Sequence, residues 1–176
     1  TLHITQFEGS NALSSFRVQQ LLPALQGVHE KIAGISARFV HLVAGDSAPD
    51  AALSAQLAAL LTYGDPYTGP TDGPLIVVSP RLGTVSPWAS KATDIAHNCG
   101  LAVHRIERLV EYRLTLKNGL LSKTALTAEQ LERVGLALPH HAAFGLQHAF
   151  IYDPQPQAHL VAGRQRAGRA EGGPGI

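Results

Sequence analysis

The feature that most constrains the fold is a regular alternation of strand-like and helix-like stretches. Residues 2–7, 35–43, 75–78 and 104–116 carry strand patterns, and a helical period of apolar residues follows each of them. Glycine and proline crowd the segment 62–74, which therefore predicts a loop between two halves. The order is strand-helix-strand-helix, twice, and this order indicates an α+β fold.

The first predicted helix has a clear apolar stripe, but a proline lies inside this stripe. Its stripe begins at Leu13, and Ser10 or Asn11 is suited to cap its first free amides. Pro23 falls inside the stripe, and a proline in a helix interior removes a hydrogen bond and clashes with the preceding turn. We therefore expect this helix to kink or end near Leu22.

The other three helices have stronger boundary signals. Asp50 is a good cap for the second helix, and Ser86 caps the third, with a proline directly after it. Gly100 is the expected left-handed residue that ends the third helix. Thr127 caps the fourth helix, and Gln130 stands where it can close a capping box.

The two halves resemble each other at a nearly constant offset. The segment 13–16 precedes 85–88 by 72 positions, and 53–55 precedes 126–128 by 73. Both pairs place a hydroxyl cap before a helix start, and we interpret the offset as a trace of internal duplication, with coincidence as the alternative. Since each unit would expose one sheet face for the other to cover, we expect a two-layer α+β sandwich with pseudo-twofold symmetry.

The domain boundaries follow from these patterns. We predict one domain over residues 1–135, with pseudo-repeats 1–63 and 74–135 joined by the linker 64–73. Beyond it lysine disappears, histidine accumulates and the end is rich in glycine and arginine, a composition that cannot bury a core. Residues 136–176 are therefore predicted to be a divergent or truncated tail.

Composition excludes several classes of partner. The net charge is +1, which is too weak a field for nucleic acid or an anionic membrane as the main partner. Arg105, Arg108 and Arg113 alternate with glutamates on the fourth strand, and we interpret them as an ordinary mixed-charge face. No apolar run approaches about 20 residues, so no membrane span is expected.

The number of cysteine residues indicates the redox compartment of the protein. Cys99 is the single cysteine, which excludes an internal disulfide framework and fits a reducing compartment. We expect it to be a buried, inert thiol, because a helix C-terminus disfavours a thiolate. The chain has no methionine, so the start residue was removed or the chain is a trimmed piece, and its start shows no secretory signal.

The densest polar run, residues 86–100, lies on the predicted third helix. Ser90, Asp94 and His97 share one face, but a catalytic triad needs a nucleophile on a sharp turn and an oxyanion hole. We interpret this face as one that packs against another domain or lines a polar cavity, with solvated surface as the alternative. The residues assigned to this interface or channel-facing role are Ser86, Trp88, Ser90, Lys91, Thr93, Asp94, His97 and Asn98.

Two kinds of binding site have weaker signals. His97, Cys99 and His104 lack the spacing of a zinc site, so no metal is expected. Arg81 and Thr84 lie between a strand and a helix N-terminus, where an anion could sit. A stand-alone anion-binding module therefore remains an alternative function, and a homodimeric protein-interaction domain is another.

A longer run of residue identities adds a family resemblance. Residues 80–101, followed by 105–108, closely resemble the N-terminal region of the large single-chain bacterial phosphoribosylformylglycinamidine synthases, also called formylglycinamide ribonucleotide amidotransferases. Three further segments fit the same pattern: Gly9–Arg17, Tyr63–Gly64 and Leu126–Gln130. The resemblance covers about residues 2–134.

The resemblance implies an activity that this chain alone does not carry. Enzymes of this cytoplasmic family make the amidine of formylglycinamide ribonucleotide in purine biosynthesis, using ATP, magnesium and ammonia released from glutamine. The resemblance places the ATP-binding and glutaminase residues beyond residue 176, so no catalytic residue and no cofactor is carried over to this chain. It implies a scaffold that braces the synthase domain against the glutaminase domain and helps form the ammonia path. In the family this region looks like a fused pair of small subunits, which agrees with the duplication.

The resemblance ends after about Val134. Divergence, a frame error or a truncated product would each explain the change, and we favour an out-of-frame or degenerate tail. A scaffold domain without its partner domains would expose apolar patches, so we expect that the isolated chain can self-associate.

Overall fold

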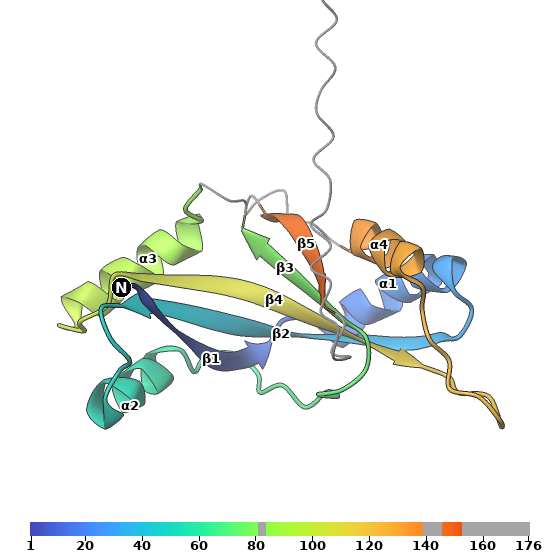
Figure 1. Ribbon diagram of the computed structural model, residues 1–176, viewed down its shortest axis with the longest axis horizontal. Coiled ribbons are helices and arrows are strands. Elements are labelled where there is room, and N and C mark those ends of the chain that lie inside the picture. The colour runs from blue at the N-terminus through green and yellow to red at the C-terminus, as the bar shows by residue number, and fades with distance from the viewer. Residues whose placement is uncertain (81–83, 139–145, 153–176) are drawn as a thin grey trace, which may run out of the picture.

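The computed structural model describes residues 1–80, 84–138 and 146–152, and its elements alternate between strand and helix (Figure 1). The strands are β1 (His3–Asn11), β2 (Ile32–Gly45), β3 (Leu75–Pro80), β4 (Arg105–Leu116) and β5 (Leu146–Tyr152). The helices are α1 (Ser15–Val28), α2 (Ala51–Leu60), α3 (Pro87–Asn98) and α4 (Ala128–Ala137). The predicted alternation is confirmed, and β5 comes from the segment that the sequence assigns to the tail. None of the helices in the described ranges is both long and apolar enough to cross a membrane.

All five strands join in one open sheet. Their order is β1-β2-β4-β3-β5, and every neighbouring pair is antiparallel. β2 and β4 form the long central ladder, which runs from Ile32 opposite Leu116 to Ala44 opposite Arg105. The expectation that one half covers the sheet face of the other is wrong, because β2 and β4 satisfy each other's backbone groups edge to edge.

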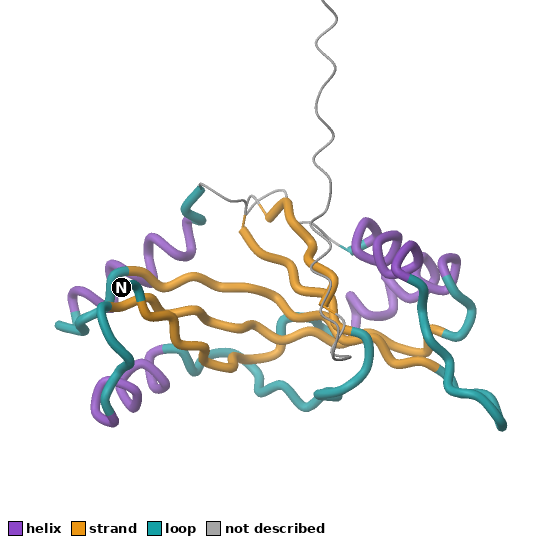
Figure 2. The backbone as a smooth tube through the Cα atoms, viewed as in Figure 1, coloured by secondary structure: helices purple, strands orange, loops and turns teal. Residues whose placement is uncertain are grey.

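The four helices pack against the same face of this sheet. The β2–β4 register places Ile35 opposite Leu114 and Val43 opposite Ile106, and side-chain alternation puts all four on one face. α1 and α4 pack around the first pair, whereas α2 and α3 pack around the second. Figure 2 shows these two helix pairs at opposite ends of the sheet. We call this the helix-bearing face.

The boundary signals of α2, α3 and α4 are confirmed. The side chains of Asp50, Ser86 and Thr127 each accept a hydrogen bond from the backbone three residues later. Gln130 closes the predicted capping box, so both orphan donors are satisfied there. Gly100 has a φ of 75°, the left-handed conformation that glycine adopts without strain.

The first helix differs from its prediction in two ways. Its cap is Ser14, which accepts from the backbone of the third residue along, while Ser10 and Asn11 belong to β1. The helix also continues through Pro23 to Val28. Leu25, which lies beyond the proline, is fully buried in the core, and we attribute the continuation to this burial.

Residues 62–74 form a loop, as predicted, and its later part, from Tyr67 to Gly73, lies over the face opposite the helices. Arg38 lies on that opposite face, and its guanidinium is 5.8 Å from the centre of the Tyr67 ring. Arg113 lies on the same side and donates to the Gly73 carbonyl at 3.1 Å. Gly73 has a φ of 90°, and a Cβ there would be 2.7 Å from a backbone oxygen, so the loop needs glycine at this point.

Candidate functional site

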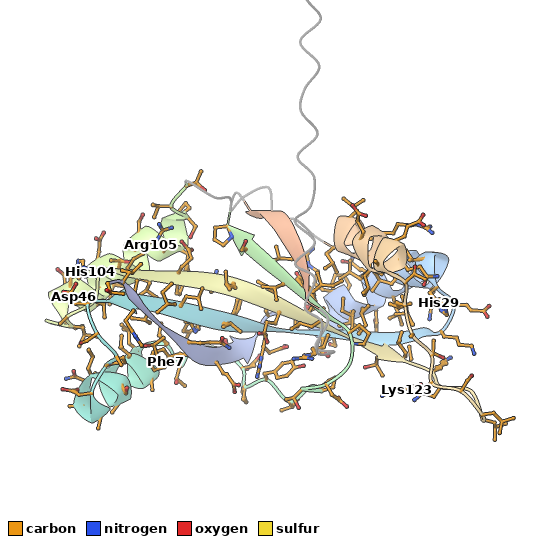
Figure 3. All side chains as sticks on the ribbon, in the orientation of Figure 1. Phe7, His29, Asp46, His104, Arg105 and Lys123 are labelled. Atoms are coloured by element: carbon orange, nitrogen blue, oxygen red, sulfur yellow. The ribbon has the colours of Figure 1, made fainter. Side chains whose placement is uncertain are left out.

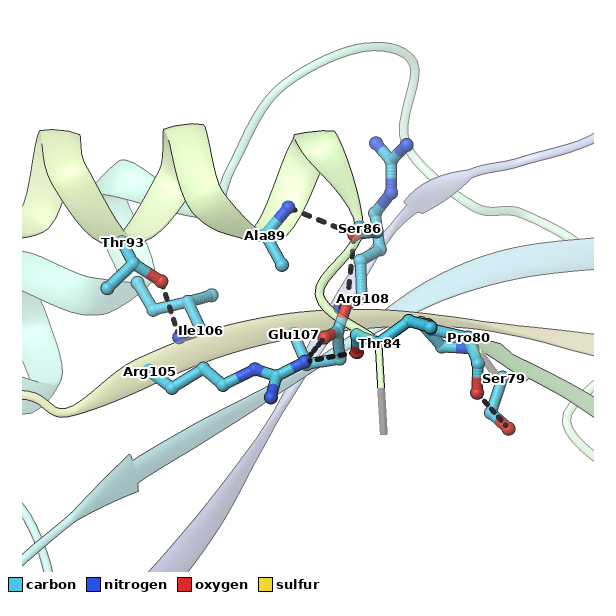
Figure 4. A network of polar contacts seen from close by, with 10 residues as sticks. All are labelled: Ser79, Pro80, Thr84, Ser86, Ala89, Thr93, Arg105, Ile106, Glu107 and Arg108. Atoms are coloured by element: carbon cyan, nitrogen blue, oxygen red, sulfur yellow. Dashed lines mark hydrogen bonds and ion pairs between the residues drawn. The ribbon is translucent and has the colours of Figure 1, made fainter. Parts of the chain in front are cut away.

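The start of α3 lies where β3 and β4 part. β3 pairs with β4 only as far as Val110, so the edge of β4 beyond that residue lacks a strand partner. α3 packs along this edge, and the Thr93 hydroxyl accepts the Ile106 backbone N–H at 3.0 Å (Figure 4). A helix side chain therefore satisfies a donor that would otherwise be exposed at a strand edge.

A polar network fixes the first turn of α3. The Ser86 hydroxyl accepts from the Ala89 N–H and donates to the Glu107 carboxylate, both at 3.1 Å (Figure 4). Arg105 forms an ion pair with Glu107 and also donates to the Thr84 carbonyl at 3.1 Å. The helix start is thus tied to β4 through a neutralised carboxylate, which gives α3 a defined position on the sheet.

Arg108 lies behind this turn and is held between two aromatic rings. Its guanidinium carbon is 4.2 Å from the centre of the Phe39 ring and 4.5 Å from that of Trp88. Its Nη1 donates to the Tyr63 hydroxyl at 3.2 Å. Within the described residues no carboxylate pairs with Arg108. The faces of the rings therefore stabilise this cation in place of an acidic side chain.

His41 completes the group and stands opposite Arg108 in the β2–β4 register. It is fully buried, and its Nε2 lies 2.8 Å from the Tyr63 hydroxyl. Burial first, and then the Arg108 charge, lower the pKa of His41 to about 4, while the Phe7 backbone acts in the opposite direction. His41 is therefore neutral at pH 7. We call Phe39, His41, Tyr63, Trp88 and Arg108 the aromatic–cation cluster.

The hydrogen bonds of the cluster favour one tautomer of His41. A guanidinium only donates, so the Tyr63 oxygen accepts from Arg108, and its own proton is free to go to His41 Nε2. The remaining imidazole proton then lies on Nδ1, which is buried without a partner in hydrogen-bond geometry, although the Phe7 backbone is close enough to affect its charge. The cluster therefore holds a neutral imidazole beside a fixed cation.

Gly9 is needed for the packing of this cluster. A Cβ at Gly9 would be 2.6 Å from Cε1 of His41 and 2.7 Å from the Phe39 carbonyl oxygen. The second atom is backbone and cannot move aside, so any larger residue displaces β1 from β2.

Three of the predicted interface residues contribute to the inner side of α3, and five face outward. Ser86, Thr93 and Trp88 contact β4 or the cluster, as described above. The exposed residues are Ser90, Lys91, Asp94, His97 and Asn98. The His97 ring bonds the Val103 carbonyl at 2.7 Å, so it serves the turn after the helix rather than a nucleophile.

The remaining candidates separate into one correction and one untested site. Cys99 is exposed at the end of α3, so the prediction of a buried thiol is wrong, because the inward positions here are taken by Ala96 and, after the turn at Gly100, by Leu101. Arg81 lies outside the described residues, and Thr84 takes part in the site through its carbonyl, so the anion site stays a prediction. No group of three or more His, Cys, Asp or Glu able to hold a metal occurs in the described ranges.

The sequence interpretation missed the cluster itself. The prediction of a mixed-charge face made of Arg105, Arg108 and Arg113 is wrong for Arg108, because the register places it on the helix-bearing face. The available signal was phase: Arg108 and His41 occupy positions that alternate with apolar residues on their strands. A charged residue in an inward phase indicates a buried interaction.

The outer side of Trp88 contributes to an apolar pocket of about 190 Å³ between the end of α2 and α3. The pocket is lined by Leu60, Leu61, Tyr63, Trp88, Lys91, Ala92 and Ile95. It opens beside the exposed polar stripe of α3, so this surface offers both apolar and polar contacts to a partner.

A protein-family model matches the part of the chain that carries this site. The protein-family model of the formylglycinamide ribonucleotide amidotransferase N-terminal region matches residues 38–139, which is more than half of the chain. The matched range contains α2, α3, α4 and all five residues of the aromatic–cation cluster. It extends a few residues past Val134, where the resemblance in the sequence ends, while β1 and α1 precede it.

Proposed function

Because the chain belongs to the formylglycinamide ribonucleotide amidotransferase N-terminal family of purine biosynthesis, we propose that it is a non-catalytic scaffold domain of such a ligase. In this role it braces the synthase domain against the glutaminase domain and forms part of the wall of the ammonia path. ATP and magnesium act elsewhere in the enzyme. Residues outside this chain convert formylglycinamide ribonucleotide to its amidine.

The observation that carries this proposal is the set of contacts that fix α3 on the sheet. On its inner side Ser86 bonds the Glu107 carboxylate, and the Trp88 ring packs on the Arg108 guanidinium. The Thr93 hydroxyl bonds the backbone of β4 at Ile106. The outer side of α3 presents a polar stripe and an apolar pocket. A helix fixed in this way holds its outer face in one orientation, and such pre-organisation lowers the cost of docking another domain.

The test uses the full-length enzyme with Lys91→Ala and Asp94→Ala, both on the exposed stripe. Glutamine-dependent turnover should fall several-fold while turnover with added ammonia is retained, because docking is impaired and the reacting groups are not. Glu132→Ala and Arg133→Ala on α4 are matched controls, since they also remove exposed helix charges. Unchanged coupling of the two activities in the α3 variants would contradict the proposal.

We further propose that the two halves arose by duplication. The strand order β1-β2-β4-β3 is symmetric about the β2–β4 ladder, and the caps Ser14 and Ser86 are 72 positions apart, which supports the proposal. Ser54 does not support it, because it lies inside α2 whereas its counterpart Thr127 is a cap. If residues 1–63 and 64–152, expressed as two chains, assemble into the native fold, the halves are separable units. Failure to assemble would argue against duplication.

A further inference from the structure

The connection from β4 to α4 carries two unusually exposed apolar side chains. Leu120 and Leu121 have relative exposures of 105% and 102%, against at most 73% for the other large apolar residues of the described chain. Figure 1 shows this connection running out past the end of β4 before it returns to α4. Two adjacent leucines in water contribute nothing to the core, so their position calls for a partner.

Hydrogen bonds hold this segment in a narrow hairpin. The Gly119 N–H donates to the Ser122 carbonyl at 3.1 Å. Thr124 closes the base, since its N–H donates to Asn118 Oδ1 at 3.2 Å and its hydroxyl donates to the Lys117 carbonyl at 2.7 Å. The two leucines are therefore presented by an ordered structure, which we call the arm (residues 117–124).

The base of the arm is positively charged. Lys117 and Lys123 lie within it, and the ammonium of Lys31 lies 3.9 Å from where a Cβ of Gly119 would stand. These are three of the four lysines in the whole chain. The arm itself contains no acidic residue, whereas Glu30 precedes Lys31 and Asp72 lines a pocket together with Lys123, so the three lysines still leave a net positive collar around the apolar tip. Figure 3 places Lys123 on this projecting segment.

We propose that the arm inserts Leu120 and Leu121 into an apolar pocket rimmed by carboxylates on another domain of the amidotransferase. Two leucine side chains match a pocket of aliphatic and aromatic residues, and the lysine collar matches acidic groups at its rim. The inference rests on the proposed scaffold role and adds a second contact surface, at the end of the sheet opposite α3. Ordered hydrogen bonds favour a protein partner, because the arm is already fixed in the shape that it presents.

The test measures the accessibility of the arm by cysteine labelling. Leu120→Cys is placed in a Cys99→Ser background, because Cys99 is itself exposed. Labelling at this position, followed by peptide mass spectrometry, should be about ten-fold slower in the full-length enzyme than in the 176-residue chain. The rate is normalised to Leu2→Cys, an exposed position just before the edge strand β1. Equal normalised rates in the two proteins would overturn the proposal.

A second variant tests the chemistry of the tip. Leu120→Asp with Leu121→Asp should abolish the protection of Lys117 and Lys123 from acetylation in the full-length enzyme, whereas Leu120→Met with Leu121→Met should retain it. Folding of each variant is checked in the 176-residue chain by the near-ultraviolet spectrum of Trp88, which is its single tryptophan. Protection that persists in the aspartate variant overturns the insertion of the tip.

The labelling also separates this inference from the scaffold proposal. If the arm is accessible while Lys91→Ala and Asp94→Ala still uncouple the enzyme, the arm fails and the scaffold role stands. If the arm is protected while those variants have no effect, the assignment of α3 fails instead. Two further measurements test other occupants of the tip: co-sedimentation of the wild-type chain with phosphatidylcholine–phosphatidylserine vesicles, and its dimerisation in sedimentation velocity. If the wild-type chain binds vesicles or dimerises, and Leu120→Asp with Leu121→Asp abolishes that binding or dimerisation, the proposal is overturned.

Discussion

The two ends of the helix-bearing face are built from similar parts and filled in different ways. At the α1–α4 end the inward positions are uncharged, and Leu25, Ile35 and Leu114 belong to one buried cluster there. Towards the α2–α3 end the central ladder instead places His41 opposite Arg108. One end is therefore an ordinary core, whereas the other includes a polar group that must be satisfied by specific partners.

The starts of α1 and α3 show the same contrast on a smaller scale. Ser14 and Ser86 cap their helices in the same way. Two residues later Phe16 is 65% exposed, whereas Trp88 packs on Arg108 and His41. Equal local signals thus lead to unequal roles, because what the helix meets on the sheet decides how its aromatic residue is used. The difference suggests that the α2–α3 end is built for recognition and the α1–α4 end for stability.

The largest expected effect compares one truncation at each end. Leu114→Ala should lower the free energy of unfolding by about 3–5 kcal/mol, because it opens a cavity in a closed core. Trp88→Ala should cost about 2 kcal/mol, since the ring is only partly buried and its loss leaves no closed cavity. Urea unfolding followed by far-ultraviolet circular dichroism measures both. Leu136→Ala, which truncates an exposed leucine, is the control and should change stability little. Equal costs at the two ends would remove the distinction between them.

The elements of the fold could be predicted because their signals are local. Asp50, Thr127 and Gly100 act on the residues beside them, and each produced the predicted helix end. The alternation of strand and helix likewise depends on short-range periodicity. Ser86 is predicted both as a cap and as a site residue, and its hydroxyl contacts both the Ala89 N–H and the Glu107 carboxylate.

The parts that could not be predicted depend on distant partners. Pro23 stays inside a helix because Leu25 is buried by the sheet, and helix propensity carries no information about that burial. Tyr63 sits in a loop and joins the cluster only because the fold brings it to His41 and Arg108. The sequence pattern supplied the inward phase of two of these residues but not the register that pairs them.

The second prediction uses pH to separate the two ends. The pKa of His41 falls from 6.5 to about 4 on folding, so the unfolded chain binds the extra proton between these values. Stability should therefore be complete above pH 6.5 and should decrease by about 2–3 kcal/mol as pH falls towards 4, with no further loss from this group below that. Urea midpoints across this range measure the effect. His41→Gln should flatten the slope, and His3→Gln, at an exposed histidine of the edge strand β1, is the matched control. A slope that persists in His41→Gln would contradict the assignment.

The smallest expected effect isolates the contact between the cation and the rings. Arg108→Lys keeps the charge but removes the planar guanidinium that lies between Phe39 and Trp88. The desolvation free energy of an ammonium is also less favourable than that of a guanidinium. The variant should lose about 1 kcal/mol of stability, and a double-mutant cycle with Trp88→Leu should give a coupling of similar size. Arg17→Lys, at an exposed position on α1, is the matched control at the other end and should be nearly neutral. If Arg108→Lys is as mild as its control, the rings do not stabilise the cation, and the α2–α3 end loses the feature that distinguishes it from the α1–α4 end.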